Sequence, residues 1–294
     1  MKAFIFSSFL IITSVLYGQN KLVIDESIDS ETREHLNEFA ENNQFFELVS
    51  EDVDSTFLFK SSDTKLQLFT PEGELVFQVP KINLVDLSKR EEFFMELEAL
   101  APILFLRSVE MRVDEFDVTI NIIPMKLRQG AEGKSLKDFE QSEVRYTYTP
   151  GQPIPQIPEG TIAMFEFVNN ANSPIYYSLV NVSPDYEVTV LFPQKNQSPV
   201  DCRLEEGENY IPSFVFQVGE PYGIDILKII VSNKPIQLSE KIIKTRGKGD
   251  KSDGAESPFE AILRPALQGV KTRGKNSSEA LSISSFRYEI VKAE

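Results

Sequence analysis

The residues that could act as nucleophile and base are few and far apart in this sequence. The chain of 294 residues contains one histidine, His35, and one cysteine, Cys202. A catalytic thiol or hydroxyl needs a base within hydrogen-bond reach and a third group that orients that base. We expect His35 and Cys202 to lie in different domains, and the sequence has no Gly-x-Ser-x-Gly motif. We therefore predict no catalytic residue and interpret the chain as a binding or accessory protein, not an enzyme.

Metal ligands are equally scarce. One imidazole and one distant thiol fall short of an ordinary zinc site, so we expect His35 to be an exposed helix residue. We expect Cys202 to be buried and inert, and a single cysteine allows no internal disulfide. The glycine-containing stretch at 247–254 lacks the residues of a phosphate-binding or calcium-binding loop. The sequence thus predicts no bound metal and no cofactor.

Carboxylates are the one plentiful chemical group. Two facing carboxylates in a cleft can hydrolyse a glycosidic bond, which leaves a carboxylate-based hydrolase acting on polysaccharide open as the alternative function. The densest clusters are Glu91, Glu92, Glu96 and Glu98, and Asp114, Glu115 and Asp117. A chain with a net charge of −15 produces such pairs by chance, so we expect these clusters to be solvated surface.

A basic repeat interrupts this acidic sequence. The residues at 243–248 (Ile-Lys-Thr-Arg-Gly-Lys) recur at 270–275 with valine in the first position. The residues most suited to binding or proteolytic processing are Lys244, Arg246, Lys271 and Arg273. The segment could bind an anionic polymer, fold onto the acidic body of the protein, or be cut by an arginine-specific protease, and we favour folding onto the acidic body.

The N-terminus has the pattern of a secretory signal peptide. Lys2 precedes an apolar run at 4–16, and the small residue Gly18 suits a cleavage site, which assigns residues 1–18 to the leader. The run is shorter than the ~20 residues needed to span a bilayer, so we expect no stable membrane insertion after cleavage. The net charge opposes binding to nucleic acid. We expect a periplasmic or secreted protein whose partner is another envelope or exported protein.

Residues 21–128 predict a small α+β domain. Strand patterns occur at 21–25, 45–49, 56–60, 65–70, 74–79 and 116–124, and helical spacing occurs at 30–39 and 86–100. The second helix can extend to about Leu106 despite Pro102. Pro71-Glu72-Gly73 predicts the turn of a hairpin. Residues 129–160 contain four prolines at 150, 153, 155 and 158, which indicate a linker.

Residues 161–294 show short β patterns separated by turn residues, at intervals typical of a sandwich. The basic segment at 241–276 forms an insertion, and a last strand at 281–291 returns to the sandwich. The predicted fold class is therefore an α+β N-terminal domain followed by an all-β sandwich-like C-terminal domain.

This β region resembles a domain of unknown function that accompanies bacterial caspase-like, metacaspase-related peptidases. The likeness is carried by residues 174–182 (Pro-Ile-Tyr-Tyr-Ser-Leu-Val-Asn-Val), 185–193, 207–212, 218–225 and 227–232. The insertion around 257–260 is also similar, and residues 45–123 resemble, more weakly, the spacer that follows the peptidase unit. The resemblance covers about 45–292 and is strongest from Thr161 onward.

The departure from those peptidases concerns the catalytic unit. A leader and a short segment stand where the caspase unit would be, and the His and Cys dyad is missing. The resemblance therefore implies an attached, non-catalytic domain and a caspase-like peptidase as a partner, but it carries no protease activity over to this chain.

Overall fold

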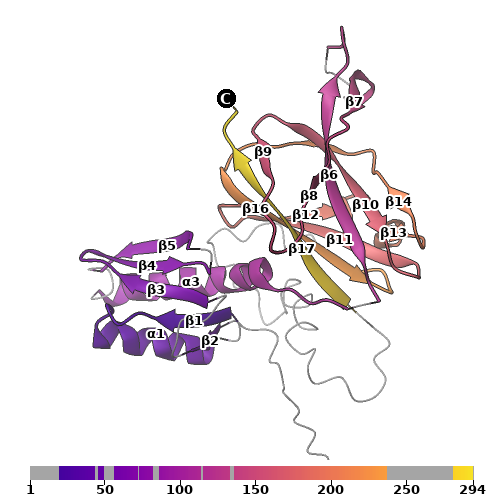
Figure 1. The fold of residues 1–294 in the computed structure, drawn as a ribbon. Helices are drawn as coiled ribbons and strands as arrows, with labels where there is room; N and C mark the ends of the chain where they lie inside the picture. Colours follow the sequence, from indigo (N-terminus) through magenta and orange to yellow (C-terminus); the bar gives the residue numbers. More distant parts are fainter. Residues whose placement is uncertain are drawn as a thin grey trace, which may run out of the picture.

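The computed structural model describes residues 20–43, 46–49, 56–71, 73–81, 86–113, 115–132, 136–236 and 281–293. These residues form three β-sheets and two α-helices, so the predicted β-rich character is confirmed (Figure 1). The predicted signal peptide at 1–18 and the insertion at 241–276 lie outside the described residues. No helix in the described ranges combines the length and apolarity needed to cross a membrane.

The first sheet has the strand order β2-β1-β3-β4-β5. Its strands are β1 (Asn20–Ile24), β2 (Phe46–Leu48), β3 (Thr56–Ser61), β4 (Lys65–Phe69) and β5 (Leu75–Pro80). Strand β1 runs parallel to both β2 and β3, whereas β3, β4 and β5 are antiparallel. The predicted hairpin joins β4 to β5, and Gly73 takes the positive φ of 84° that favours glycine in this turn.

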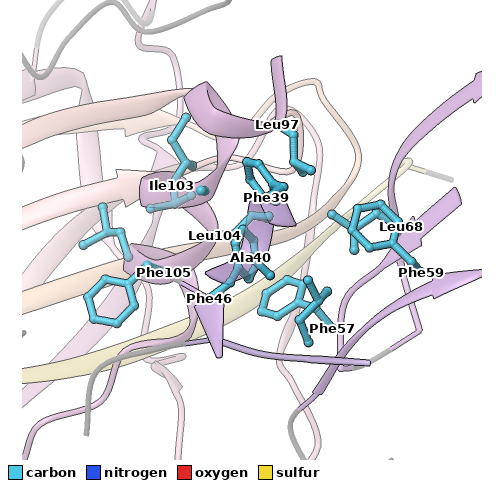
Figure 2. Packing of buried hydrophobic residues seen from close by; sticks show 14 of the residues in the cluster. Phe39, Ala40, Phe46, Phe57, Phe59, Leu68, Leu97, Ile103, Leu104 and Phe105 are labelled. Atoms are coloured by element: carbon cyan, nitrogen blue, oxygen red, sulfur yellow. The ribbon is translucent and has the colours of Figure 1, made fainter. Parts of the chain in front are cut away.

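Two helices pack against this sheet. Helix α1 (Ser30–Asn42) is capped by Asp29, and α3 (Leu87–Ser108) is capped by Asp86, whose carboxylate accepts hydrogen bonds from the first backbone N–H groups. Helix α3 continues through Pro102. Figure 2 shows apolar side chains of both helices in one cluster with those of the first sheet, and the ring centroid of Phe39 on α1 lies 6.0 Å from that of Phe46 on β2. The alternation of buried residues in β3 and β4 gives the sheet one apolar face for the helices.

The second and third sheets pack face to face. The second has the order β14-β10-β6-β7, with β15 on β10 and β8 on β6, and the third has the order β12-β11-β16-β17-β9, with β13 on β11. The strands of the second sheet are β6 (Val118–Leu127), β7 (Phe139–Gln141), β8 (Tyr146–Thr147), β10 (Ile162–Asn169), β14 (Asn209–Tyr210) and β15 (Val215–Gln217). Those of the third are β9 (Gln156–Pro158), β11 (Ile175–Val182), β12 (Val188–Phe192), β13 (Arg203–Leu204), β16 (Gly223–Ser232) and β17 (Leu281–Val291). The predicted closing strand is confirmed as β17, which pairs with β16 along its length.

Two segments, residues 116–124 and 129–160, pair differently from the sequence-based expectation. Strand β6 was expected to close the N-terminal region, but it pairs with β10 in the second sheet from Val118 to Pro124. Its inward residues Ile120 and Ile122 belong to the core between the second and third sheets. The stretch expected to be a linker contributes β7, β8 and β9 to these sheets. Alternating apolar residues specify a strand but not its neighbour, which is why the sequence did not reveal these pairings.

The third sheet is buried on both faces. Along β16, Leu227 and Ile229 face the second sheet, whereas Ile226 and Ile230 belong to the core that contains α3. The C-terminal turns of α3 are buried accordingly from Ile103 to Arg107. In Figure 1 the C-terminal end of α3 points from the first sheet toward the strands of the third. The third sheet, with β16 near its centre, therefore contributes side chains to both cores.

Candidate functional site

The sequence-predicted basic candidates cannot be located in the fold. Lys244, Arg246, Lys271 and Arg273 lie outside the described residues. Their proposed binding or processing role stays a prediction.

The lone histidine and cysteine lie in separate parts of the molecule. Cys202 is fully buried in the core between the second and third sheets, and burial raises the pKa of its thiol to about 12. His35 on α1 is half-buried, not exposed as predicted, because Arg90 of α3 lies against it with Nη1 2.7 Å from His35 Nε2. His35 thus helps to join the two helices, and the structure does not bring the two residues together.

The acidic clusters face solvent. Glu91, Glu92, Glu96 and Glu98 are exposed on α3, and Glu115 and Asp117 are exposed in the segment before β6. Asp114 lies outside the described residues. Among the residues that the structure describes, no group of three or more His, Cys, Asp or Glu side chains could hold a metal ion.

A pocket of about 240 Å³ opens between the second and third sheets, where β11 ends and β16 begins. Its walls are mainly apolar: Phe165 and Phe216 come from the second sheet, and Leu191, Leu227 and Ile290 come from the third. The segment from Val218 to Pro221, which leads into β16, forms one side. The polar side chains in the lining include Asn181, Gln217, Glu220, Asp225 and Tyr288.

The register of the third sheet shows that three polar side chains of this pocket, Asp225, Tyr288 and Asn181, lie on the same face of the sheet. Asp225 and Tyr288 are directly opposed on β16 and β17, and Asn181 of β11 is opposed to Leu227. Opposed residues share one face of a sheet, as do residues two apart on one strand. Because Leu227 faces the second sheet, all three polar side chains lie on that same inner face.

Asp225 is a buried carboxylate that lacks a full set of hydrogen bonds. Only 5% of the residue is exposed. Its Oδ2 accepts a hydrogen bond from the Tyr288 hydroxyl at 2.6 Å, whereas its Oδ1 has no hydrogen-bond partner in the described parts of the chain. Asn181 Oδ1 is likewise buried without a partner among those residues. Two acceptor oxygens therefore stand unsatisfied at one pocket, which is rare for buried polar atoms.

Burial dominates the electrostatics of this group. Loss of hydration raises the pKa of Asp225 to about 6, and the negative charge of Asp185 adds slightly to the rise. The Tyr288 hydroxyl, the Asn181 amide and the guanidinium of Arg107 oppose it. The pKa of Tyr288 is raised well above its usual value, first by burial and then by Asp225. At neutral pH the site therefore holds a carboxylate beside a neutral phenol.

A second buried carboxylate shows what full pairing looks like. Glu166 on β10 accepts hydrogen bonds from the amides of Asn121 at 2.7 Å and Asn209 at 3.2 Å. Arg145 lies 3.5 Å away and completes the pairing. Glu166 is thus a structural acid, and Asp225 differs from it because no ion pair joins it to a cation in the described ranges.

Two buried cations lie on the other face of the third sheet. Arg107 of α3 donates to Glu74 Oε2 at 2.9 Å and to the Ile224 carbonyl at 3.2 Å, with its guanidinium over the Tyr186 ring. Lys228 is fully buried and donates to the Val109 carbonyl at 2.7 Å and to Ser285 Oγ at 2.6 Å. These contacts hold α3 and the segment after it against the third sheet.

Sequence reasoning missed the Asp225 site. Asp225 and Lys228 are the two charged residues of β16, and every residue of this strand from Asp225 onward is buried. A charge inside a predicted central strand was the available signal, because a buried charge requires a partner or a function. The face to which each charge points was not readable, since a strand covered on both sides shows no alternation.

The chain matches no protein-family model, and a search among curated protein sequences found no match.

Proposed function

We propose that this protein is an exported, non-catalytic binding module of the bacterial envelope. In this proposal residues 1–18 direct export, an α+β unit precedes a β-sandwich domain, and the sandwich carries the binding site. The leader pattern, the lack of a His and Cys dyad in the sequence and the Asp225 pocket support the proposal together.

The observation that carries the binding role is that Asp225 Oδ1 has no hydrogen-bond partner among the residues that the structure describes. A buried carboxylate with one free oxygen is destabilising in the unbound protein, because its lost hydration is not replaced. Proteins keep such groups where a ligand supplies the missing partner. The surrounding apolar walls and the few converging polar atoms have the composition of a recognition pocket.

The proposed partner is another envelope or exported protein. The resemblance of residues 161–292 to the domain that accompanies caspase-like peptidases favours such a peptidase as that partner. Nucleic acid is a poor candidate because the net charge of −15 repels phosphate.

Affinity capture tests this function. The mature full-length chain, its Asp225→Asn variant and a Glu206→Gln control would each be incubated with envelope extract at physiological salt. Glu206 is exposed and is not part of the pocket lining, so the control removes the same charge elsewhere. We expect the wild type and the control to retain one common protein that the Asp225→Asn chain loses. Recovery of nothing, or equal recovery by all three chains, would contradict the binding role.

One observation favours the alternative function, a carboxylate-based hydrolase. Asp225 and Glu220 line the same pocket, and a pKa near 6 suits a general acid. Against it, the pocket volume of about 240 Å³ lies below the ~300–1,000 Å³ typical of small-molecule sites, which leaves little room for a polysaccharide. Release of reducing sugar from cell-wall or storage polysaccharides, abolished by Glu220→Gln as well as by Asp225→Asn, would establish the hydrolase instead.

The basic segment at 241–276 has a separate proposed role. We favour its association with the acidic body of the protein over the binding of an anionic polymer or cleavage at Arg246 and Arg273. Intact mass measurement of the mature exported protein decides the last point, since a chain that spans both arginines excludes processing there.

A further inference from the structure

We infer that the Asp225 pocket receives the cationic end of an alkyl side chain, that of a lysine or an arginine on the partner protein. The inference rests on the proposed binding function and names the chemistry that the site would select.

The first step concerns hydrogen bonding. Within the described part of the pocket lining, two buried side-chain atoms have no hydrogen-bond partner, Asp225 Oδ1 and Asn181 Oδ1, and both are acceptors. A complementary ligand must therefore bring donors. A lysine ammonium has three N–H donors and an arginine guanidinium has five, and neither has an acceptor that would clash with these oxygens. An anion or a carbonyl group would add acceptors where donors are missing.

The second step concerns charge. Asp225 is ionised at neutral pH, and the nearby cation, Arg107, lies behind the sheet, where it already binds Glu74. Glu220 adds a second carboxylate at the exposed side of the pocket. A charge that is buried without a contacting counter-charge favours the arrival of one. The net charge of −15 further attracts cationic ligands over longer distances.

The third step concerns shape. The pocket that Asp225 lines has apolar walls, formed by Phe165, Phe216, Leu191, Leu227 and Ile290. The methylene groups of lysine and arginine pack well on such surface while their charged ends seek polar atoms. The volume of about 240 Å³ suits one side chain and not a folded segment.

Binding of single amino-acid derivatives tests this chemistry without the partner. The probes are the Nα-acetyl N-methylamides of lysine, arginine, norleucine and glutamate, titrated into the isotope-labelled full-length chain and followed by the amide signals of Gly219, Asp225 and Tyr288. We expect saturable shifts with lysine or arginine, and binding weaker by about tenfold or more for norleucine. The two cations distinguish an ammonium site from a guanidinium site. Equal binding of norleucine, or saturable shifts with glutamate alone or with none of the four, would overturn the inference.

Variants separate the carboxylate from general charge. Asp225→Asn should lower the affinity for the cationic probe by about tenfold or more, whereas Glu206→Gln should leave that affinity unchanged. Unchanged dispersion of the amide signals shows that the Asp225→Asn chain is folded. Equal weakening by both variants would assign the binding to the overall charge of the protein and refute the site.

Acidification provides an independent readout. Affinity for the cationic probe should fall as the pH drops through about 6, because protonation removes the charge of Asp225. The groups that act on this carboxyl are Tyr288, Asn181 and the charged Arg107 and Asp185. Glu220 is a further charged residue in the lining of the same pocket. Affinity that stays constant down to pH 5 would contradict the assignment to Asp225.

The outcomes distinguish this inference from the proposed function. A partner captured in an Asp225-dependent manner by a chain that shows no preference for cationic probes would leave the binding role standing and refute the ligand class. If cationic probes bind at Asp225 while the extract yields no partner, the ligand class would stand and the proposed binding of an envelope protein would be refuted.

Discussion

Replacing Asp225 with asparagine keeps the shape of the side chain and removes its charge, and we expect this change to stabilise the protein. The folded state raises the pKa of Asp225 from 3.8 to about 6, so the folded protein holds the proton more tightly than the unfolded chain does. The free energy of unfolding therefore falls as the pH rises from about 4 to about 6, and the full deficit is present above that range. Linkage of protonation to folding gives a deficit of about 3 kcal/mol at pH 7 and only about 0.6 kcal/mol at pH 4.

The asparagine variant should recover most of this deficit. Its amide oxygen can still accept the hydrogen bond from Tyr288, and the neutral amide loses far less hydration on burial than an ionised carboxylate does. We expect a gain in unfolding free energy of about 1–3 kcal/mol at pH 7, and a gain that shrinks toward pH 4.

Urea unfolding of both proteins at several pH values between 4 and 8 measures this difference directly, because the other titrating groups cancel in the comparison. Glu206→Gln serves as the control that removes one exposed charge, and it should change the unfolding free energy by less than about 0.5 kcal/mol. Loss of stability in the asparagine variant at pH 7, or a gain independent of pH, would refute the assignment of a strained, ionised carboxylate to the pocket.

Three further predictions concern the buried groups. Burial lowers the pKa of Lys228 from 10.5 to about 7, so the free energy of unfolding should increase as the pH rises from 7 toward 10. In urea unfolding, the stability of the wild type relative to Lys228→Met should increase by about 2 kcal/mol between pH 7 and 9. A difference that stays constant over this range would contradict the shift. Arg107→Ala should lower the free energy of unfolding by about 2–4 kcal/mol because it leaves Glu74 and backbone carbonyls without their donor. Arg107→Lys should lower the free energy of unfolding by less, because it keeps a charged donor. Thermal unfolding that ranks the two variants in the opposite order would argue against this contact. In the native protein Cys202 should resist alkylation by iodoacetamide at pH 8, since its thiol is buried and its pKa is raised to about 12. Mass spectrometry should detect labelling only after denaturation. Rapid labelling of the native protein would instead place the thiol at the surface.

Local signals in the sequence predicted individual elements well. Asp86, the predicted start of α3, is its N-cap, and the helix begins at the next residue. The predicted hairpin turn includes Gly73, and β17 coincides with the predicted strand at 281–291. These features depend on capping, turn chemistry and alternation, which are properties of neighbouring residues.

Long-range pairing was harder to predict. The placement of β6 beside β10, and of β9 beside β17 at the edge of the third sheet, depends on residues far apart in the chain. The pocket was missed for the same reason. Asp225 and Tyr288 are 63 positions apart, and only the register between β16 and β17 brings them together.

The double coverage of the third sheet also limits how the protein can be divided. Val180, Val182, Ile226 and Ile230 lie in the core that includes α3 and the first sheet. A fragment that began at Val118 would keep both sheets of the sandwich and lay this apolar surface bare, so it would tend to aggregate. Any excised version of the binding half would need polar replacements on that face, or would have to retain the N-terminal residues as its permanent cover.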